Sequence, residues 1–328
     1  MINRIVLPST GLSTSVLGAG CASLGSRYAR ADGLRALGAA FDAGVTWYDV
    51  APAYGAGDAE PILGEFMQGR RDSLTVCSKV GVIPPKRNGA IKLAYSLGRP
   101  LLGVAGGLRR AFRKSKATRN VAVALNPEFI RNSLDRTLQR LRTDYVDVLA
   151  LHKVSEQDLA DPFIQDTLRS ILKSGKARHI STAGSAQAAV AALAYPDVYS
   201  IVQLADNPTL RPLDAVRSAA PGPIGIVTHS VFGVDGAKDR FTAKVKAEPQ
   251  LRALLEGAGY EGSEEKIVAD LLLDRALASN AQGVVLTSMF SPRHLASNVD
   301  RASRPVNPRA IELVDAIVAR GIEITSVI

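Results

Sequence analysis

The sequence predicts an α/β fold, a (β/α)8 or TIM barrel, with a basic insertion after its third strand. Eight apolar, strand-like segments alternate with helical patterns along the 328 residues, mostly through short connections. Unbroken alternation indicates a parallel sheet, and eight units in this length favour a closed barrel. An open Rossmann-type sheet is the alternative, but its glycine-rich turn is only loosely matched by GAGCASLG, residues 18–25. We expect one domain over residues 1–328.

The first half of the chain supplies four strands and the helices between them. Runs of apolar and β-branched residues predict strands over 14–20, 45–49, 73–80 and 145–152. Apolar residues at helical spacing predict helices over 31–44, 60–69 and 126–141. Asp32 is the expected N-cap of the first helix. Asn126 is the expected N-cap of the third, and Pro127 suits its first turn.

The second half repeats the pattern. Strands are expected over 177–182, 198–206, 223–230 and 283–288, and helices over 162–175, 185–194, 213–220, 263–279 and 292–299. A longer connection, residues 231–262, follows the seventh strand. Ser263 is the expected N-cap of the helix after that connection, and two glutamates in its first turn complement the helix dipole.

The net charge of +9 comes from one segment. Residues 86–119 hold ten Lys and Arg and no Asp or Glu, so the chain without them carries −1. We place this segment in a loop insertion over 81–120. It has three interpretations: a loop over the barrel rim, a positive lid suited to an anionic substrate, or a surface for an anionic membrane or partner. With aromatics only at Tyr95 and Phe112, it gives little support to nucleic-acid binding.

The chain has the features of a cytoplasmic protein. Cys21 and Cys77 lie in apolar contexts, which predicts buried, reduced thiols. No N-terminal segment resembles a signal peptide, and no uncharged apolar run reaches the roughly 18 residues of a membrane span. The four histidines show no metal-ligand spacing, which argues against a metal-dependent hydrolase.

Polar residues stand where the predicted strands end. In a parallel barrel these ends meet at one mouth, which is where barrel enzymes place their chemistry. The strand-end residues are Asp49, Lys79, His152, Thr182, Gln203, His229 with Ser230, and Ser288. A buried Asp and a buried Lys from neighbouring strands can neutralise each other.

Tyr54 lies five residues beyond Asp49 and is a candidate general acid. A free phenol has a pKa of roughly 10, and we expect the ammonium of Lys79 to lower the pKa of Tyr54. Asp49 would hold Lys79, and His152 could orient a bound carbonyl by a hydrogen bond. This combination suits protonation of a carbonyl oxygen during reduction by hydride.

These motifs, taken in order, resemble the aldo-keto reductase family. The resemblance rests on DVAPAYGAGDAE around Asp49 and Tyr54, SKV around Lys79, LRTDYVDVLALH ending in His152, VQLADNP around Gln203, and SPRHLASNV near the C-terminus. It implies a barrel that binds an extended nicotinamide cofactor without a Rossmann domain. It also implies a catalytic tetrad of Asp49, Tyr54, Lys79 and His152.

The resemblance places the cofactor as well. Ser291 and Pro292 open a helix whose N-terminus favours a phosphate, and Arg293 and His294 match the family's site for the 2′-phosphate of NADP. We therefore expect NADPH, with NADH as the alternative. The expected contacts are Gln203, His229, Ser230, Ser288, Arg293, His294 and Asn298.

Two positions depart from the family pattern. Ala183 and Gly184 stand where many relatives have a Ser-Asn pair that holds the nicotinamide amide, and His229 stands where a tyrosine commonly stacks on the nicotinamide ring. These changes bear on cofactor affinity and geometry more than on the type of reaction.

Three functions remain open from the sequence. The first is NADPH-dependent reduction of an aldehyde or ketone, with an anionic or sugar-like compound as substrate. The second is the reverse reaction, an NAD(P)-dependent sugar or alcohol dehydrogenase. The third is a non-catalytic barrel that senses NADP(H).

Overall fold

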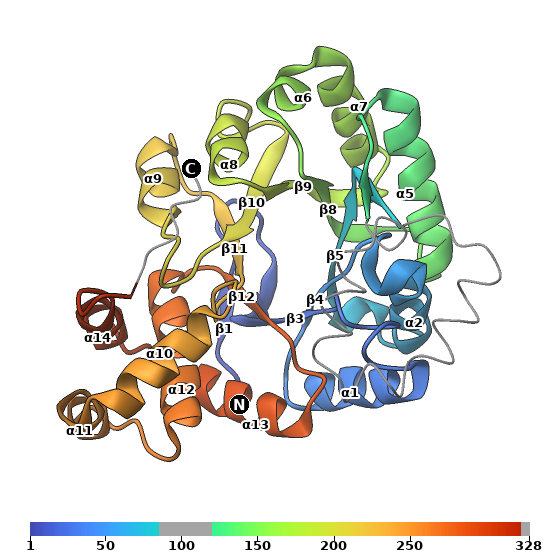
Figure 1. The fold of residues 1–328 in the computed structure, drawn as a ribbon. Helices are drawn as coiled ribbons and strands as arrows, with labels where there is room; N and C mark the ends of the chain where they lie inside the picture. The colour runs from blue at the N-terminus through green and yellow to red at the C-terminus, as the bar shows by residue number, and fades with distance from the viewer. Residues whose placement is uncertain (85–119, 323–328) are drawn as a thin grey trace.

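The structure, a computed structural model, describes residues 1–84 and 120–322. Eight parallel strands close into a barrel in the order β10-β11-β12-β3-β4-β5-β8-β9, surrounded by helices (Figure 1). The predicted (β/α)8 fold is therefore confirmed. The barrel strands are β3 (Leu17–Gly20), β4 (Trp47–Asp49), β5 (Thr75–Val80), β8 (Val146–His152), β9 (Ala177–Gly184), β10 (Tyr199–Ala205), β11 (Gly225–His229) and β12 (Val284–Thr287).

The helices follow the strands in sequence. Those with eight or more residues are α1 (Arg30–Asp42), α2 (Ala59–Phe66), α5 (Pro127–Leu141), α7 (Pro162–Lys173), α10 (Ala237–Ala247), α11 (Pro249–Gly257), α12 (Glu264–Ser279), α13 (Pro292–Ala302) and α14 (Arg309–Val318). Shorter ones are α6 (Glu156–Ala160), α8 (Ala186–Ala192), α9 (Leu213–Ala219) and the 3₁₀ turns η1 (Tyr54–Gly57) and η2 (Arg71–Ser73). None of the helices in the described part of the chain is long and apolar enough to cross a membrane.

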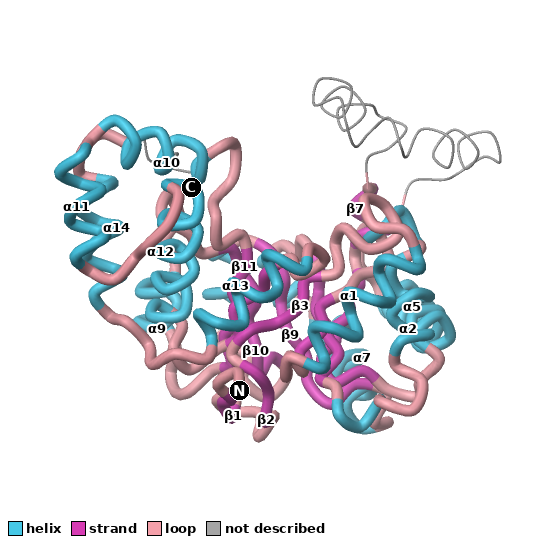
Figure 2. Tube along the Cα trace, turned by 90° about the horizontal axis from the view of Figure 1, so that it is seen from below, coloured by secondary structure: helices cyan, strands magenta, loops and turns pink. Residues whose placement is uncertain are grey.

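The barrel interior is a small apolar core, closed from below by an N-terminal hairpin. Strands β1 (Arg4–Val6) and β2 (Ser13–Ser15) pair antiparallel beneath the barrel (Figure 2). Leu7, at the end of β1, is fully buried against the interior residues, which include Trp47, Cys77, Val148 and Ile201. The hairpin covers the N-terminal end of the barrel interior, at the end opposite the one where barrel enzymes place their active sites.

Several local predictions are confirmed. The Asn126 side chain accepts a hydrogen bond from the backbone N–H of Phe129 at 2.8 Å, and Ser263 caps α12 in the same way. The apolar stripe of α5 is buried as a face: Ile130, Leu134, Leu138 and Leu141. Cys21 and Cys77 are free and buried, and burial raises the pKa of both thiols.

One local prediction is wrong, and one segment contains helices that were not predicted. The N-cap of α1 is Ala29, and Asp32 lies in the first turn, where it pairs with Arg35. The connection 231–262 contains two helices, α10 and α11. Their apolar faces pack with α12 and α14 into a second core beside the barrel, centred on Phe241, Leu251 and Leu271. Packing of α10 and α11 against α12 and α14 explains why residues 231–262 are ordered although they contain no strand.

The basic segment 86–119 lies outside the described residues, but both its flanks are described. Strand β6 (Val82–Ile83) pairs antiparallel with β7 (Val121–Ala122), with Ile83 opposite Val121. The chain therefore leaves the barrel after β5 and returns to the same place before α5.

Candidate active site

A cavity of about 720 Å³ opens at the C-terminal ends of the barrel strands. All four predicted catalytic residues line it, and so do four of the predicted cofactor residues. The complete lining is Gly20, Ala22, Ser23, Asp49, Tyr54, Lys79, His152, Lys153, Val154, Ala183, Gly184, Ser185, Gln203, His229, Ser230, Leu286, Thr287 and Ser288. Parallel strands brought these residues together from positions as distant as 20 and 288 in the sequence.

Asp49 and Lys79 form a buried ion pair at the floor of the cavity. The Nζ of Lys79 lies 2.5 Å from Oδ1 of Asp49 and 3.2 Å from the carbonyl oxygen of Val50. The amide nitrogen of Gln203 donates to Oδ2 of Asp49 at 3.0 Å. Burial is the largest single effect and lowers the pKa of Lys79, but Asp49, Tyr54 and Cys77 together outweigh it, so the pKa is raised and the side chain is an ammonium.

Tyr54 is held beside this pair by the turn η1. Gly55 has φ of 59°, and a Cβ there would collide with the carbonyl oxygen of Leu24, so the turn requires glycine at this position. The Nζ of Lys79 lies 5.1 Å from the centroid of the Tyr54 ring. Burial raises the pKa of Tyr54, and Lys79 offsets only part of that increase. The expectation of a net lowered pKa is therefore wrong, because desolvation of the phenolate is the larger effect.

His152, the last residue of β8, faces Tyr54 edge-on. The two ring centroids are 6.3 Å apart with an interplanar angle of 87°. Burial lowers the pKa of His152 to about 3, with smaller contributions from Lys79, Lys153 and His229. Its Nδ1 is buried and has no hydrogen-bond partner among the described residues. The ring is thus a neutral imidazole at neutral pH.

Four of the predicted cofactor residues lie on the cavity wall. Gln203 uses its amide nitrogen on Asp49, and its Oε1 lies 3.9 Å from the Sγ of Cys77. His229 and Ser230 are joined by a 2.9 Å hydrogen bond between Nδ1 and Oγ. Ser288 lies just beyond β12. Ala183 and Gly184, the departures from the family pattern, also line the cavity, where they present no side chain larger than a methyl group.

The other three cofactor residues, on α13, do not line the cavity. Arg293 and His294 are exposed at the first turn of this helix. Burial lowers the pKa of His294, and the charges of Lys238, Arg293 and Arg27 lower it further. Four basic side chains from three segments of the chain are therefore close enough to interact electrostatically. Asn298 is buried and donates to Oγ1 of Thr287, a lining residue, at 3.2 Å. Ser291 stands at the N-cap, but its side chain makes no capping bond.

Two further comparisons with the sequence prediction concern the cavity wall. Thr182 is buried but does not line the cavity, because β9 continues two residues past it to Gly184. The sequence reasoning missed four polar lining residues, Ser23, Lys153, Ser185 and Thr287. Of these, Lys153 directly follows the predicted strand-end residue His152, so reading one residue further would have found it.

Curated relatives resemble parts of the chain. It is 31% identical over 160 residues to pyridoxal 4-dehydrogenase of Microbacterium luteolum, covering 47% of this chain and 44% of that protein. D-threo-aldose 1-dehydrogenase of a Pseudomonas species is 28% identical over 240 residues, covering 68% of each chain. L-galactose dehydrogenase of Arabidopsis thaliana is 27% identical, covering 54% of this chain. The chain spans less than half the length of the first and third of these relatives.

Solved structures share the fold over nearly the whole chain. An aldo-keto reductase from Klebsiella pneumoniae, in complex with NADPH, superposes with a TM-score of 0.67 at 17% identity, covering 97% of this chain and 95% of that one. An aldo-keto reductase from Bacillus halodurans gives 0.66 at 16% identity, covering 97% and 96%. The model of the aldo/keto reductase family matches residues 16–319. With that match over almost its full length, the chain belongs to the aldo/keto reductase family.

Proposed function

We propose that this protein is an NADPH-dependent oxidoreductase that reduces an aldehyde or ketone, with Tyr54 as the general acid. The observation that carries the proposal is the cavity itself, in which a buried Asp49–Lys79 pair, a tyrosine and a neutral histidine meet. A wall of small residues leaves room for a substrate next to them. Family membership supports a nicotinamide-dependent oxidoreductase as the class of enzyme.

The residues present suit a nicotinamide dinucleotide. The Gln203 amide and the hydroxyls of Ser230 and Ser288 are groups that hydrogen-bond a carboxamide, and the imidazole of His229 offers a flat face. Outside the cavity, Arg27, Lys238 and Arg293 form a positive group around the neutral imidazole of His294, which can add a hydrogen bond, and this group suits the cofactor's phosphates. The three positive charges favour NADPH, which has one phosphate more than NADH.

The roles of the chain's own residues follow from their protonation. When bound, the nicotinamide cofactor supplies the hydride. Tyr54 is protonated at neutral pH because its pKa is raised, and it gives its proton to the carbonyl oxygen as the C–H bond forms. The ammonium of Lys79 stabilises the phenolate left behind, and solvent restores its proton. His152, as a neutral imidazole, orients the carbonyl by donating a hydrogen bond.

The reverse reaction is a second candidate. Two of the relatives, D-threo-aldose 1-dehydrogenase and L-galactose dehydrogenase, are named for oxidation of sugars. The same tyrosine would then act as the base that removes the hydroxyl proton, helped by Lys79. Assays in both directions, with aldehydes and NADPH and with sugars and NADP⁺ or NAD⁺, decide between them.

The test combines cofactor binding with substitution of Tyr54. NADPH and NADH are titrated while the fluorescence of Trp47, the only tryptophan, is followed. We expect Tyr54→Phe to bind NADPH as the wild type does and to lose about 10²- to 10⁴-fold in turnover. Tyr145→Phe is the matched control, since its hydroxyl makes only a 3.4 Å bond to Asp72 far from the cavity. Binding without turnover by the wild type would indicate an NADP(H) sensor, and binding of neither nucleotide would contradict the proposal.

A further inference from the structure

Lys153 is a cation in the wall of the cavity to which the mechanism assigns no role. It follows His152 directly, lines the cavity and is exposed. Within residues 1–84 and 120–322, its ammonium has no ion-pair or hydrogen-bond partner. It is close enough to His152 to contribute to the lowered pKa of that imidazole.

The backbone at Lys153 adopts a conformation that few lysines adopt. Its φ is 58°, in the left-handed region, which is unfavourable for any residue other than glycine. The backbone N–H of Lys153 donates to the carbonyl oxygen of Ala183 at 2.9 Å, which fixes this conformation at the rim between β8 and β9. Gly184 lies alongside, where an added Cβ would sit 3.6 Å from the Cα of Lys153. The rim thus holds the start of a long basic side chain rigidly and leaves its end free.

The charges of the cavity do not balance without a ligand. Its charged lining residues are Asp49, Lys79 and Lys153, and the first two neutralise each other at 2.5 Å. The lining histidines, His152 and His229, both have lowered pKa values, chiefly because of burial, and add no positive charge at neutral pH. Among the described lining residues, the ammonium of Lys153 therefore remains as one positive charge without a counter-charge.

We propose that Lys153 is a specificity-determining residue that binds an anionic group of the substrate, a carboxylate or a phosphate. This inference rests on the proposed carbonyl reduction and adds the substrate class: a short aldehyde or ketone that carries an acidic group. With its carbonyl between Tyr54 and His152, such a compound directs its anion to the Lys153 ammonium. Lysine suits this role as a compact charge on a flexible stem that can reach anions of different length.

The test compares pairs of aldehydes in which one member carries an acidic group and the other lacks it. Succinic semialdehyde is compared with butanal, which has the same carbon chain, and glyceraldehyde 3-phosphate with glyceraldehyde. Each is measured with NADPH for the wild type, Lys153→Met, Lys153→Arg and Lys173→Met. The last variant is the control, because it removes one exposed lysine at the end of α7, four residues before β9 begins and thus at the end of the barrel away from the cavity.

We expect Lys153→Met to raise KM for one or both anionic aldehydes about tenfold, the range of a hydrogen bond to a charged group. kcat should stay within about twofold, and the neutral aldehydes should be unaffected. Lys153→Arg should restore most of the preference, Lys173→Met should change nothing, and added salt should weaken the preference of the wild type. The two pairs of substrates show whether carboxylate or phosphate is bound.

Two results would overturn the inference, and they are distinguishable. If the wild type is active on charged and neutral aldehydes and Lys153→Met affects both equally, Lys153 does not bind the anion. The proposed carbonyl reduction is then still supported. A wild-type enzyme that binds NADPH but turns over none of the four aldehydes removes the proposed function, and the inference with it.

Discussion

Protonation at the candidate site is decided by burial first and by neighbouring charges second. Lys79 remains charged in the interior because Asp49 is 2.5 Å away, while Tyr54 and His152 remain neutral because they are desolvated. A neutral phenol and a neutral imidazole are the forms that can donate hydrogen bonds to a carbonyl without bringing further charge into the cavity. Lys79, whose Nζ lies 5.1 Å from the centroid of the Tyr54 ring, is then the cation placed to stabilise a phenolate.

The lowered pKa of His152 predicts a loss of stability in acid. Its pKa is about 3 in the folded protein and 6.5 in a model peptide, so the unfolded chain binds a proton that the folded chain does not. Its contribution to stability is present above pH 6.5 and is lost as the pH falls. Between pH 7.5 and pH 5 we expect a loss of about 2 kcal/mol from this residue.

Urea unfolding of the wild type and His152→Gln at the two pH values checks this expectation. The wild type should lose about 2 kcal/mol more than the variant on acidification. His294→Gln is the control, since His294 is exposed on α13 and should account for little of the loss. Equal pH dependence of the wild type and His152→Gln would mean that His152 is protonated in the folded protein.

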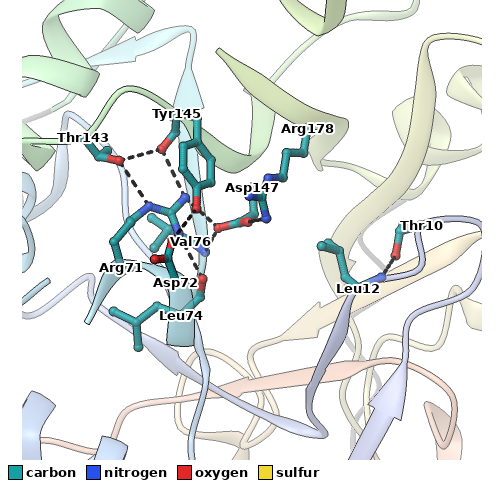
Figure 3. Close-up of polar contacts among 10 residues, drawn as sticks. All are labelled: Thr10, Leu12, Arg71, Asp72, Leu74, Val76, Thr143, Tyr145, Asp147 and Arg178. Carbon is teal, nitrogen blue, oxygen red and sulfur yellow. Dashed lines mark hydrogen bonds and ion pairs between the residues drawn. The ribbon is translucent and has the colours of Figure 1, made fainter. Parts of the chain in front are cut away.

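At the scale of secondary structure, a carboxylate ties three strands together at the end opposite the cavity. Asp147, near the start of β8, accepts hydrogen bonds from the backbone N–H of Val76 and from Nη2 of Arg71, both at 2.8 Å (Figure 3). Its other oxygen accepts from Nη1 of Arg178 on β9 at 3.0 Å. Both guanidinium groups also lie over the ring of Tyr145, at 3.8 and 4.2 Å from its centroid.

Asp147→Asn should therefore destabilise the fold without changing the chemistry. An amide cannot accept from both arginines and Val76, and its NH₂ would face a guanidinium donor. We expect a loss of about 2–4 kcal/mol in the free energy of unfolding. Asp166→Asn, which breaks an exposed pair with Arg169, should cost less than about 1 kcal/mol.

Chemical denaturation and turnover at low temperature separate the two effects. The folded Asp147→Asn protein should keep the wild-type kcat, because its substitution lies at the closed end of the barrel. A variant of wild-type stability, or a stable one with a reduced kcat, would contradict this view of Asp147.

For the molecule as a whole, the sequence was enough to predict the barrel and most of one site. Strand ends are readable because several buried strands carry a polar residue within their last three positions, which is how Asp49, Lys79, His152 and Gln203 were found. Residues such as Ser23 and Ser185 were missed because they lie in loops, where no periodicity marks which side chains turn inward. Helices α10 and α11 were missed for a related reason: they pack on α12 and α14 instead of the sheet, outside the βα repeat.

The net sign of the Tyr54 pKa shift could not be derived from the sequence. A nearby lysine predicts a lower pKa, but the shift depends on how completely the phenol is desolvated, and only the packing of η1 against β5 and β8 determines that. The position of Arg293 and His294 relative to the cavity could not be derived from the sequence either. Their place at the start of α13 was predicted, but their distance from the cavity depends on the path of the chain after β12.

The pairing of β6 with β7 predicts that the barrel does not need the basic segment. Because Ile83 already lies opposite Val121, residues 84–120 can be replaced by Asn-Gly, a two-residue hairpin turn. The barrel ladders described above all lie outside this range, and the net charge changes from +9 to −1. The replacement halves the length of the loop about four times over. Each halving lowers the entropic cost of closing the loop by about 0.6 kcal/mol, so the free energy of unfolding should rise by about 2 kcal/mol. Urea unfolding measures this, while ion-exchange elution follows the charge. A fall in stability of that size would show instead that the segment contributes contacts that the barrel requires.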